Sequence, residues 1–420
     1  MSNLFLFRRN RNFRWLLSGA ATANLGDGVA AMALPWLATL ISRDPVHIAL
    51  VSFSTYLPWL LLALPVGVLT DRADRQKLMV RADLSRLVLS FGLVLLVLAV
   101  PSLPTQNDSL GLILMLSVLA FALGAAEVVR DNTAQTCLPM LVDEQDLEAA
   151  NGQIWSIEQI MGRFIGPPVA GVLIALALPV PFSFNALAFG LAAFCVWSIV
   201  FPNRVPPKRH GSFVADMAGG IRWIIAHRII LQLAVMLGLL NALHMATNTI
   251  LVLYAQEILG LGAFGFGMLL TAGALGGVVG GLACPSLAAR LGPRNSLLLA
   301  LATMPLTYLA MMATTLPLVA AMALFLSMLA GLLWNVVTVS YRQRMIPGDI
   351  LGRVNSIYRF FGWGMMPLGA LAGGVLVAIL EPTIGREMAL RMPFLMAAVG
   401  IGGLGLYALL FLKLGREARG

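Results

Sequence analysis

Three charged residues in the first half of the chain share a helical spacing. Glu127, Arg130 and Asp131 stand at positions i, i+3 and i+4 of an apolar run, so a helix would place all three on one face. A charge in hydrocarbon costs about 3 kcal/mol or more, which makes such residues candidates for function. A carboxylate that approaches and leaves an arginine can bind and release a proton. We therefore predict proton coupling here; a static ion cluster that orders the helices is the alternative.

Two further acids lie deep in apolar runs. Asp27 lies about 20 Å along the first run, near the middle of a membrane, and Glu158 lies at mid-depth in the fifth run, with Arg163 further along it. We predict that Asp27 and Glu158 also take part in proton coupling and that Arg163 borders a substrate cavity. The sequence leaves open whether Glu127 pairs with Arg130 on its own helix or with Arg163.

The second half carries neutral polar groups at comparable depths. Asn241, His244 and Asn248 stand at i, i+3 and i+7, and Asn335 occupies the position that corresponds to Glu127. We predict that these four residues shape substrate recognition. For His244 the alternative is a hydrogen-bonded packing group, because a lone histidine in an apolar run is often one.

Composition indicates which elements must position these residues. The chain has 420 residues, of which 59% are hydrophobic and 11% charged, whereas soluble domains carry about a quarter charged residues. A spanning helix needs roughly 20 apolar residues. Twelve runs of this kind occur, at 12–41, 47–70, 78–100, 109–138, 147–178, 181–201, 228–258, 263–289, 294–314, 317–345, 351–380 and 388–414. The sequence thus predicts an all-α membrane protein with twelve transmembrane helices.

Basic residues predict the orientation of these helices. Of the 28 Lys and Arg residues, 23 fall at the N-terminus, in the hinges after even-numbered runs, in the central link and in the tail. This set includes Arg86 and Arg342, whereas the opposite side has only Arg43, Arg386 and Arg391. Because loops rich in Lys and Arg stay in the cytoplasm, we expect both termini there.

A polar link divides six runs from six. We predict an N-terminal bundle at 1–201, a cytoplasmic linker at 202–227 and a C-terminal bundle at 228–420. The two halves resemble each other, since Gln135-Thr-Cys-Leu-Pro139 recurs in part as Gln343-Arg-Met-Ile-Pro347. Transporters built from such repeats bind substrate between the halves near mid-membrane.

Several other classes of protein are disfavoured. The three cysteines, Cys137, Cys195 and Cys284, share no metal-ligand spacing, and the chain has neither an HExxH pair nor a GxxxxGK[ST] loop. No folded basic module is present for nucleic acid. We expect no metal, no cofactor and no enzymatic activity.

Two motifs carry a family resemblance. They read Gly67-x-Leu69-x-Asp71-Arg72-x-x-Arg75-x-Lys77 and Gly162-Arg-Phe-Ile-Gly166-Pro167-Pro-Val-Ala170-Gly171. The first resembles the hinge between helices 2 and 3 of the major facilitator superfamily, and the second the fifth-helix motif of its drug:proton antiporters. Further segments, including Leu351-Gly-Arg353-Val-Asn355, resemble the macrolide-efflux and enterobactin-exporter branch. Asp74 stands where the family usually has glycine, and Ala170 replaces another glycine.

The resemblance implies roles in conformational gating for both motifs. In the first, Gly67 would allow close helix approach, Asp71 would face the start of the helix near Leu351, and Arg72, Arg75 and Lys77 would reach carboxylates or lipid phosphates, favouring an outward-facing state. The alternative is that these charges only set topology. In the second, Gly162, Gly166, Pro167 and Gly171 would allow close packing and a bend.

We therefore expect a monomeric multi-pass protein of the bacterial inner, or plasma, membrane that contacts lipids. It would export a lipophilic or amphipathic small molecule in exchange for protons by alternating access. A siderophore or other metabolite exporter of the same fold is the alternative, and a nutrient importer or a non-transporting receptor is a weaker one.

Overall fold

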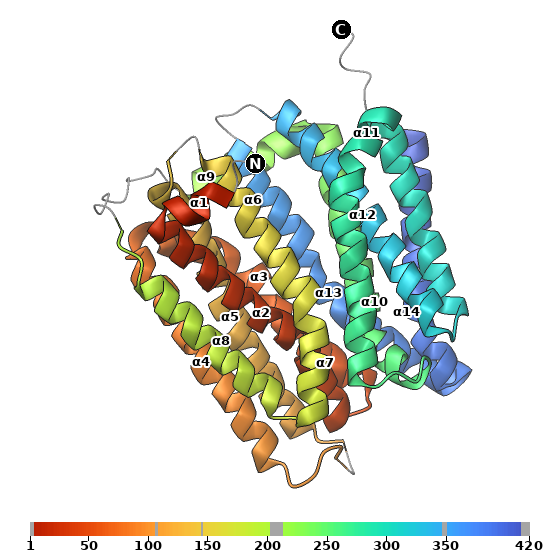
Figure 1. The fold of residues 1–420 in the computed structure, drawn as a ribbon. Coiled ribbons are helices and arrows are strands. Elements are labelled where there is room, and N and C mark those ends of the chain that lie inside the picture. The colour runs from red at the N-terminus through yellow and green to blue at the C-terminus, as the bar shows by residue number, and fades with distance from the viewer. Residues whose placement is uncertain (1–3, 106–107, 144–145, 202–212, 347–350, 413–420) are drawn as a thin grey trace. The chain divides into compact units, whose positions relative to one another are not determined.

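The protein is helical throughout the part that the structure describes (Figure 1). The structure is a computed structural model that describes residues 4–105, 108–143, 146–201, 213–346 and 351–412. Within these ranges there is no strand, and eleven helices are long and apolar enough to cross a membrane. This confirms an all-α membrane protein.

The described chain forms two compact units. Unit 1 comprises Met1–Arg43, Leu50–Lys208 and Gly262–Thr271, and unit 2 comprises Asp44–Ala49, Arg209–Leu261 and Ala272–Gly420. The helices of the first half are α1 (Leu4–Arg9), α2 (Arg11–Ile41), α3 (Pro45–Arg72), α4 (Arg75–Ala99), α5 (Leu110–Leu141), α6 (Leu147–Ile157), the π-helix η2 (Glu158–Ile165), α7 (Gly166–Leu176) and α8 (Val180–Trp197). Those of the second half are α9 (Phe213–Ala226), α10 (Arg228–Glu257), α11 (Ala263–Ala313), α12 (Pro317–Met345), α13 (Leu351–Ile384) and α14 (Arg386–Phe411).

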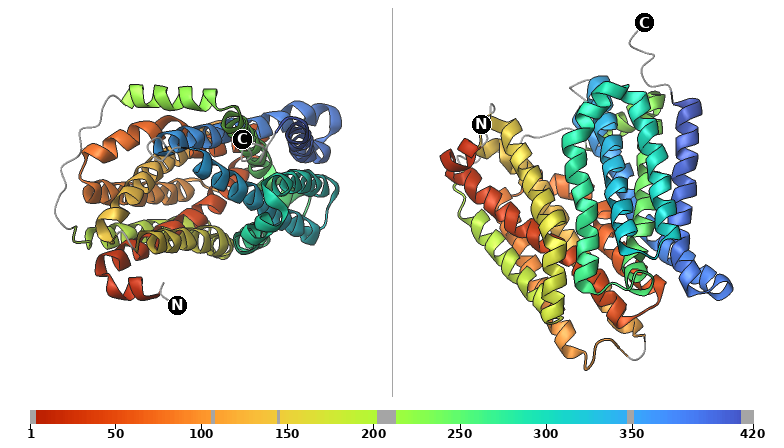
Figure 2. Two further views of the ribbon diagram at one scale, coloured as in Figure 1. Left: turned by 90° about the horizontal axis from the view of Figure 1, so that it is seen from above. Right: turned by 45° about the vertical axis from the view of Figure 1, so that its right-hand side comes forward.

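The predicted runs 263–289 and 294–314 are two helical segments under the one label α11, and they meet at a kink at Gly292, whose φ of 76° and ψ of 164° are not helical. A positive φ suits glycine, which has no Cβ, so this residue permits a kink between the two segments. In addition, part of the predicted linker is helical, because α9 forms there and packs against α13 and α10 (Figure 2).

Within unit 1, α8 packs against α2 and α4, while α5 packs against α4 and contacts α2 (Figures 1 and 2). At one end of this group, Phe13, Leu16, Met79, Cys137 and Val196 form a fully buried apolar cluster. Large apolar side chains also lie on outer faces, for example Val88, Leu98 and Val118. A helix that is apolar on all sides suits lipid as its surroundings, so only the polar residues inside the group need a separate explanation.

The hinge that we predicted at 67–77 is shorter in the structure. α3 continues through Gly67 to Arg72, and α4 begins at Arg75. Asp74 caps α4, since its carboxylate accepts a hydrogen bond from the Lys77 amide at 3.2 Å. An N-cap carboxylate satisfies an amide that has no partner within the helix, which gives Asp74 a role in place of the glycine typical of the motif.

At Gly67, no atom of another described element lies within 4 Å of where a Cβ would stand, and the predicted close helix approach there stays a prediction. Arg75 donates to the Thr136 carbonyl of α5 at 3.4 Å, and its predicted gating contact likewise stays a prediction. The side chains of Asp71 and Arg72 lie outside the described residues, and their predicted gating roles stay predictions.

Three arginines that we counted as loop charges are buried. Arg86 is 2% exposed inside α4. Arg342 lies with its guanidinium 3.6 Å from the ring centre of Tyr358, and Arg391 donates to the Thr314 carbonyl at 3.1 Å. Aromatic and carbonyl partners compensate the loss of water around these cations. The asymmetry of the remaining charges does not depend on these three.

Candidate functional site

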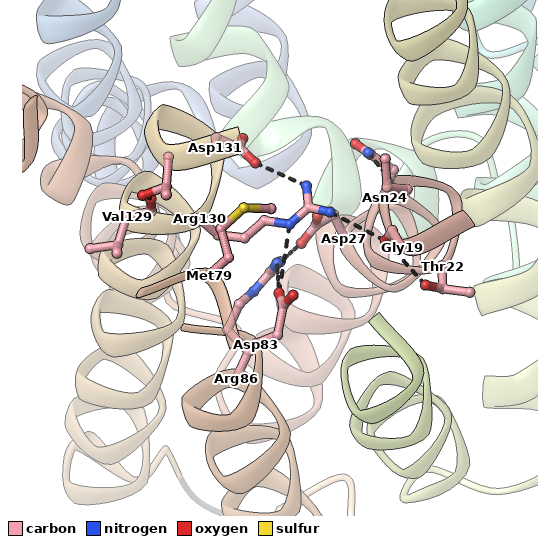
Figure 3. Close-up of polar contacts among 12 residues, drawn as sticks. Gly19, Thr22, Asn24, Asp27, Met79, Asp83, Arg86, Val129, Arg130 and Asp131 are labelled. Carbon is pink, nitrogen blue, oxygen red and sulfur yellow. Dashed lines mark hydrogen bonds and ion pairs between the residues drawn. The ribbon is translucent and has the colours of Figure 1, made fainter. Parts of the chain in front are cut away.

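Three helices of unit 1 carry charged residues far from their ends. At 1.5 Å per residue, Asp27 lies about 24 Å from the start of α2, Arg86 about 16 Å from the start of α4 and Arg130 about 16 Å from the end of α5. α5 packs against both α4 and α2, and the three side chains meet in the interior of the unit (Figure 3).

The first contact is an ion pair between α2 and α4. Asp27 and Arg86 pair directly, with 24% and 2% of their side chains exposed. On the other side of Arg86, the ring of Phe189 from α8 lies 3.9 Å from the guanidinium carbon. The aromatic face favours the cation and keeps water from it. Arg86 is thus fully enclosed, whereas Asp27 remains accessible on one side.

The second contact centres on Arg130 of α5. Its guanidinium donates to the Gly19 carbonyl of α2 at 3.2 Å and to Asp131 at 3.3 Å. Its Nε lies 3.6 Å from Oδ1 of Asp83, a fully buried residue of α4. The same Asp83 oxygen lies 3.8 Å from Nη1 of Arg86. Asp83 therefore stands between two arginines, and the ion pairs form a continuous chain from Asp27 to Asp131 (Figure 3).

This chain is charged but incompletely hydrogen-bonded. Both oxygens of Asp83, Nε and Nη1 of Arg86, and Nε of Arg130 have no hydrogen-bond partner among the described residues. A buried polar atom without a hydrogen bond costs about 1–3 kcal/mol. Electrostatic attraction holds these groups together while several hydrogen bonds remain unmade, so other pairings of the same groups are accessible.

The structure brings together some of the predicted proton-coupling residues. Asp27, Arg130 and Asp131 belong to the ion-pair chain. Glu127 forms no contact-length ion pair with any described residue; the charged groups near enough to act on it are Arg86, Arg130, Asp131 and Glu158. The side chains of Glu158 and Arg163 are exposed in the described unit. Of the two partners that the sequence left open for Glu127, neither forms a contact pair here.

Sequence reasoning missed Asp83 and misplaced Arg86. The two residues stand at i and i+3 in the run 78–100, the same spacing that identified Glu127 and Arg130. We had assigned Arg86 to the cytoplasmic hinge because of its charge. Their spacing within an apolar run was the signal that could have identified them.

Glycines on either side of Asp27 fix its position. A Cβ on Gly26 would lie 3.0 Å from the ring of Phe189, and one on Gly28 would lie 2.8 Å from the carbonyl carbon of Gly162. A Cβ on Gly166 would in turn lie 2.6 Å from Cα of Gly28. Contacts below 3 Å cannot be accommodated without movement of the backbone. The glycine motif of the fifth run therefore packs directly against the helix segment that carries Asp27.

The fifth run is also irregular. Its middle forms η2, and the Gly166 amide bonds to the Met161 carbonyl five residues back. Pro167 and Pro168 have no amide hydrogen, so they leave carbonyls of the preceding turn without their usual partners. One of these, the carbonyl of Phe164, accepts from the Thr271 hydroxyl at 3.5 Å. A Cβ on Gly171 would lie 2.8 Å from Cα of Phe264, so the start of α11 packs tightly on α7.

The predicted substrate residues of unit 2 divide into two groups. Asn241 donates to the Gly362 carbonyl of α13 at 2.9 Å, and His244 bonds to the Tyr308 hydroxyl at 3.2 Å. These two residues join helices, which agrees with the packing alternative for His244. Asn248 and Asn335 have exposed side chains, so they remain candidates for contact with a substrate. Across the described residues, no group of three or more His, Cys, Asp or Glu could hold a metal ion.

The sequence of this chain is similar to those of known transport proteins. Residues 3–410 match the family described as transmembrane secretion effector. The multidrug efflux pump Tap of Mycobacterium tuberculosis is 26% identical and covers 96% of this chain and 95% of its own. The staphyloferrin A transporter of Staphylococcus aureus is 23% identical, covering 67% and 69%. Macrolide efflux protein A of Streptococcus pyogenes is 25% identical, covering 38% and 37%.

Solved structures share the fold at low sequence identity. The crystal structure of the nucleoside transporter NupG superimposes with a TM-score of 0.71 at 11% identity, covering 96% of this chain and 99% of that one. A bacterial homologue of the human lysosomal transporter Spinster gives 0.69 at 13% identity, covering 95% of each. At such identities the likeness concerns the fold alone.

Proposed function

Because the chain belongs to the transmembrane secretion effector family of the major facilitator superfamily, we propose that it exports lipophilic or amphipathic small molecules by proton antiport. It is a multi-pass protein of the plasma membrane, and its relatives and structural neighbours are transporters rather than enzymes. We propose the direction of transport, the class of cargo and the identity of the coupling ion.

The observation that supports protons as the coupling ion is the pairing of Asp27 with Arg86. Asp27 is partly accessible, whereas its partner cation is enclosed by protein. A proton that reaches Asp27 cancels the charge that holds α2 to α4, and loss of that proton restores it. Charges inside a membrane protein usually mark such relays. We propose that Glu127, which is near enough to Arg86 to interact with it electrostatically, also binds and releases a proton. Arg130, Asp131 and Glu158 would take part in the same proton coupling.

The proposed cargo class rests on two supports. Two relatives are named as a multidrug efflux pump and a macrolide efflux protein. In addition, the two exposed residues that we predicted to contact cargo in unit 2, Asn248 and Asn335, are uncharged, which suits a cargo of low charge. Arg163, exposed in unit 1, would contact polar groups of the cargo. Protons, cargo and lipids are then the partners of a monomeric transporter.

Alternating access completes the proposal. Twelve spans, with both termini in the cytoplasm and a division near 202–227, would provide two halves that move about the cargo. Gly67, Asp71, Arg72, Arg75 and Lys77 would stabilise one end state at the cytoplasmic hinge. The glycine motif of the fifth run would keep α7 in close contact with α2 and with the start of α11, through Gly162, Gly166, Pro167 and Gly171. The short distances from Cβ positions built on these glycines to neighbouring atoms support this role.

The direct test is accumulation of dyes and antibiotics in an efflux-deficient bacterial host. Expression should lower the intracellular level of at least one lipophilic cation or macrolide, and dissipating the proton gradient should restore that level. A host that accumulates every compound equally with and without the protein would contradict export of this cargo class. Retained export after the gradient collapses would contradict proton coupling.

A second candidate cargo is a siderophore or other anionic metabolite. The relative named as a staphyloferrin A transporter favours it, and Arg163 is an exposed cation that could meet a carboxylate. Iron-limited cells that express the protein would then release more siderophore into the medium. If siderophore release rises while dye and antibiotic levels stay constant, this candidate replaces the first.

A further inference from the structure

Asp83 is the one fully buried carboxylate of the described ion-pair chain, and its position between two arginines is unusual. Its side chain is 0% exposed, against 24% for Asp27 and 35% for Asp131. It lies 3.8 Å from Arg86 and 3.6 Å from Arg130, yet neither of its oxygens accepts a hydrogen bond from a described residue. An anion placed so deeply, with its hydrogen-bonding capacity unused, can still take a closer partner.

Arg86 is the group that can make this closer contact. It pairs directly with Asp27 through one nitrogen, while its Nη1, the atom nearest Asp83, has no hydrogen bond. Asp83 and Arg86 stand at i and i+3 on α4, so a change of side-chain rotamer alone can bring them together. Movement of Arg86 from Asp27 to Asp83 therefore needs no displacement of α4.

We propose that Asp83 is a positioning residue that serves as the second counterion of Arg86, receiving the guanidinium when a proton neutralises Asp27. The inference rests on the proposed proton coupling at Asp27. In the deprotonated state Arg86 links α2 to α4. In the protonated state Arg86 turns to Asp83 within α4, and the link to α2 is released.

The surroundings of Arg86 support a choice between these two acids. The charged groups that act on it are Asp27 from α2, Asp83 on its own helix, and Glu127, Arg130 and Asp131 from α5; the ring of Phe189 from α8 lies over its guanidinium. Phe189 limits movement on one side. A buried cation left without a counterion is strongly unfavourable, so a second acid within reach lowers the cost of protonating Asp27. Arg130 has hydrogen bonds of its own to Gly19 and Asp131, which do not involve Arg86.

A double-mutant cycle on purified protein tests this without any transport assay. Asp27→Asn and Asp83→Asn are made singly and together, and thermal unfolding in detergent is followed. If either acid can serve Arg86, each single variant keeps one counterion, and the double variant loses more Tm than the two single losses combined. Additive losses would overturn the proposal.

Repeating the cycle with Arg86→Met provides the matched control. Arg86 is the shared partner in the proposal, so without it the excess loss in the double variant should disappear. Asp83→Asn removes the contact with Arg130 in both cycles, so the effect of that contact on Tm cancels when the two cycles are compared. An excess that persists without Arg86 would overturn the proposal, because the two acids would then be coupled by another route.

A transport measurement separates a positioning role from a purely structural one. In proteoliposomes, Asp83→Asn should lose at least tenfold in accumulation driven by a pH gradient while keeping exchange of cargo for cargo. Equal loss of both activities would overturn the proposal. If the wild type itself shows no response to the gradient, the proposed function fails, while the thermal cycle still decides whether Asp83 is the second counterion.

Discussion

Gly28 on α2 lies so close to Gly166 on α7 that a Cβ on Gly166 would be 2.6 Å from the Cα of Gly28. This contact joins the fifth-helix glycine motif to the residue next to Asp27. The motif therefore packs against the helix segment that carries Asp27 and holds this segment in place.

Substitution of Gly28 should therefore be costly. We expect Gly28→Ala to lower the free energy of unfolding by about 1–3 kcal/mol or more, because a methyl group would overlap the backbone of Gly162. Thermal unfolding in detergent measures the loss. Gly152→Ala is the control, since no described atom lies within 4 Å of its Cβ position and alanine favours helix by up to about 1 kcal/mol. Equal effects of both substitutions would contradict this packing.

The N-cap at Asp74 gives a second prediction. Asp74→Ala removes the acceptor for the Lys77 amide and should cost about 1 kcal/mol of stability. Asp74→Asn keeps a capping oxygen and should cost a few tenths at most, since the ion pair with Lys77 is long, at 3.9 Å, and exposed. Thermal unfolding of both variants distinguishes a cap from a charge effect. If Asn destabilises as much as Ala, the charge is what matters.

Asn241 and Asn248 form a matched pair on α10. Asn241→Val should lose about 1 kcal/mol of stability because it removes the hydrogen bond to the Gly362 carbonyl of α13. Asn248→Val should leave stability nearly unchanged and alter which compounds are exported, because its side chain is exposed. Thermal unfolding and a panel of export substrates report the two effects separately. An unchanged panel for Asn248→Val would remove this residue from the proposed cargo site.

The hinge prediction concerns Asp71. If its carboxylate stabilises an outward-facing state, Asp71→Asn should shift the population toward the inward-facing state. Labelling of single cysteines on each side of the membrane measures that shift, with Lys77→Gln as a comparison at the other end of the motif. Identical labelling of Asp71→Asn and wild type on both sides would leave only a topological role for the charge.

Much of the fold was predictable because membrane helices have a strong sequence signal. Apolar runs long enough to span a membrane identified most helices to within a few residues. The N-cap role of Asp74 was not predicted from the sequence and comes from the structure. The helix α9 in the predicted linker was not predictable, because its packing on α13 decides whether it forms.

The site was predictable only in part. Asp27, Arg130 and Asp131 were identified by depth and spacing, but which acid meets which base depends on how α2, α4 and α5 are rotated. The sequence does not give that rotation. For this reason the partner of Glu127 stayed open, whereas Asp83 and Arg86 could have been identified by their i, i+3 spacing within an apolar run. Asn241 and His244 were likewise selected because they are polar residues in an apolar run, and in the structure they form hydrogen bonds between helices.

The central claim is that protonation of Asp27, the partner of Arg86, couples transport to the proton gradient. Purified wild type and Asp27→Asn are compared in proteoliposomes for cargo movement driven by a pH gradient and for exchange of cargo without a gradient. Asp146→Asn is the control, since it also removes an acid paired with an arginine, but at the surface with Arg9. We predict that Asp27→Asn abolishes gradient-driven movement and retains exchange, while Asp146→Asn retains both. Undiminished gradient-driven transport by Asp27→Asn would contradict the account.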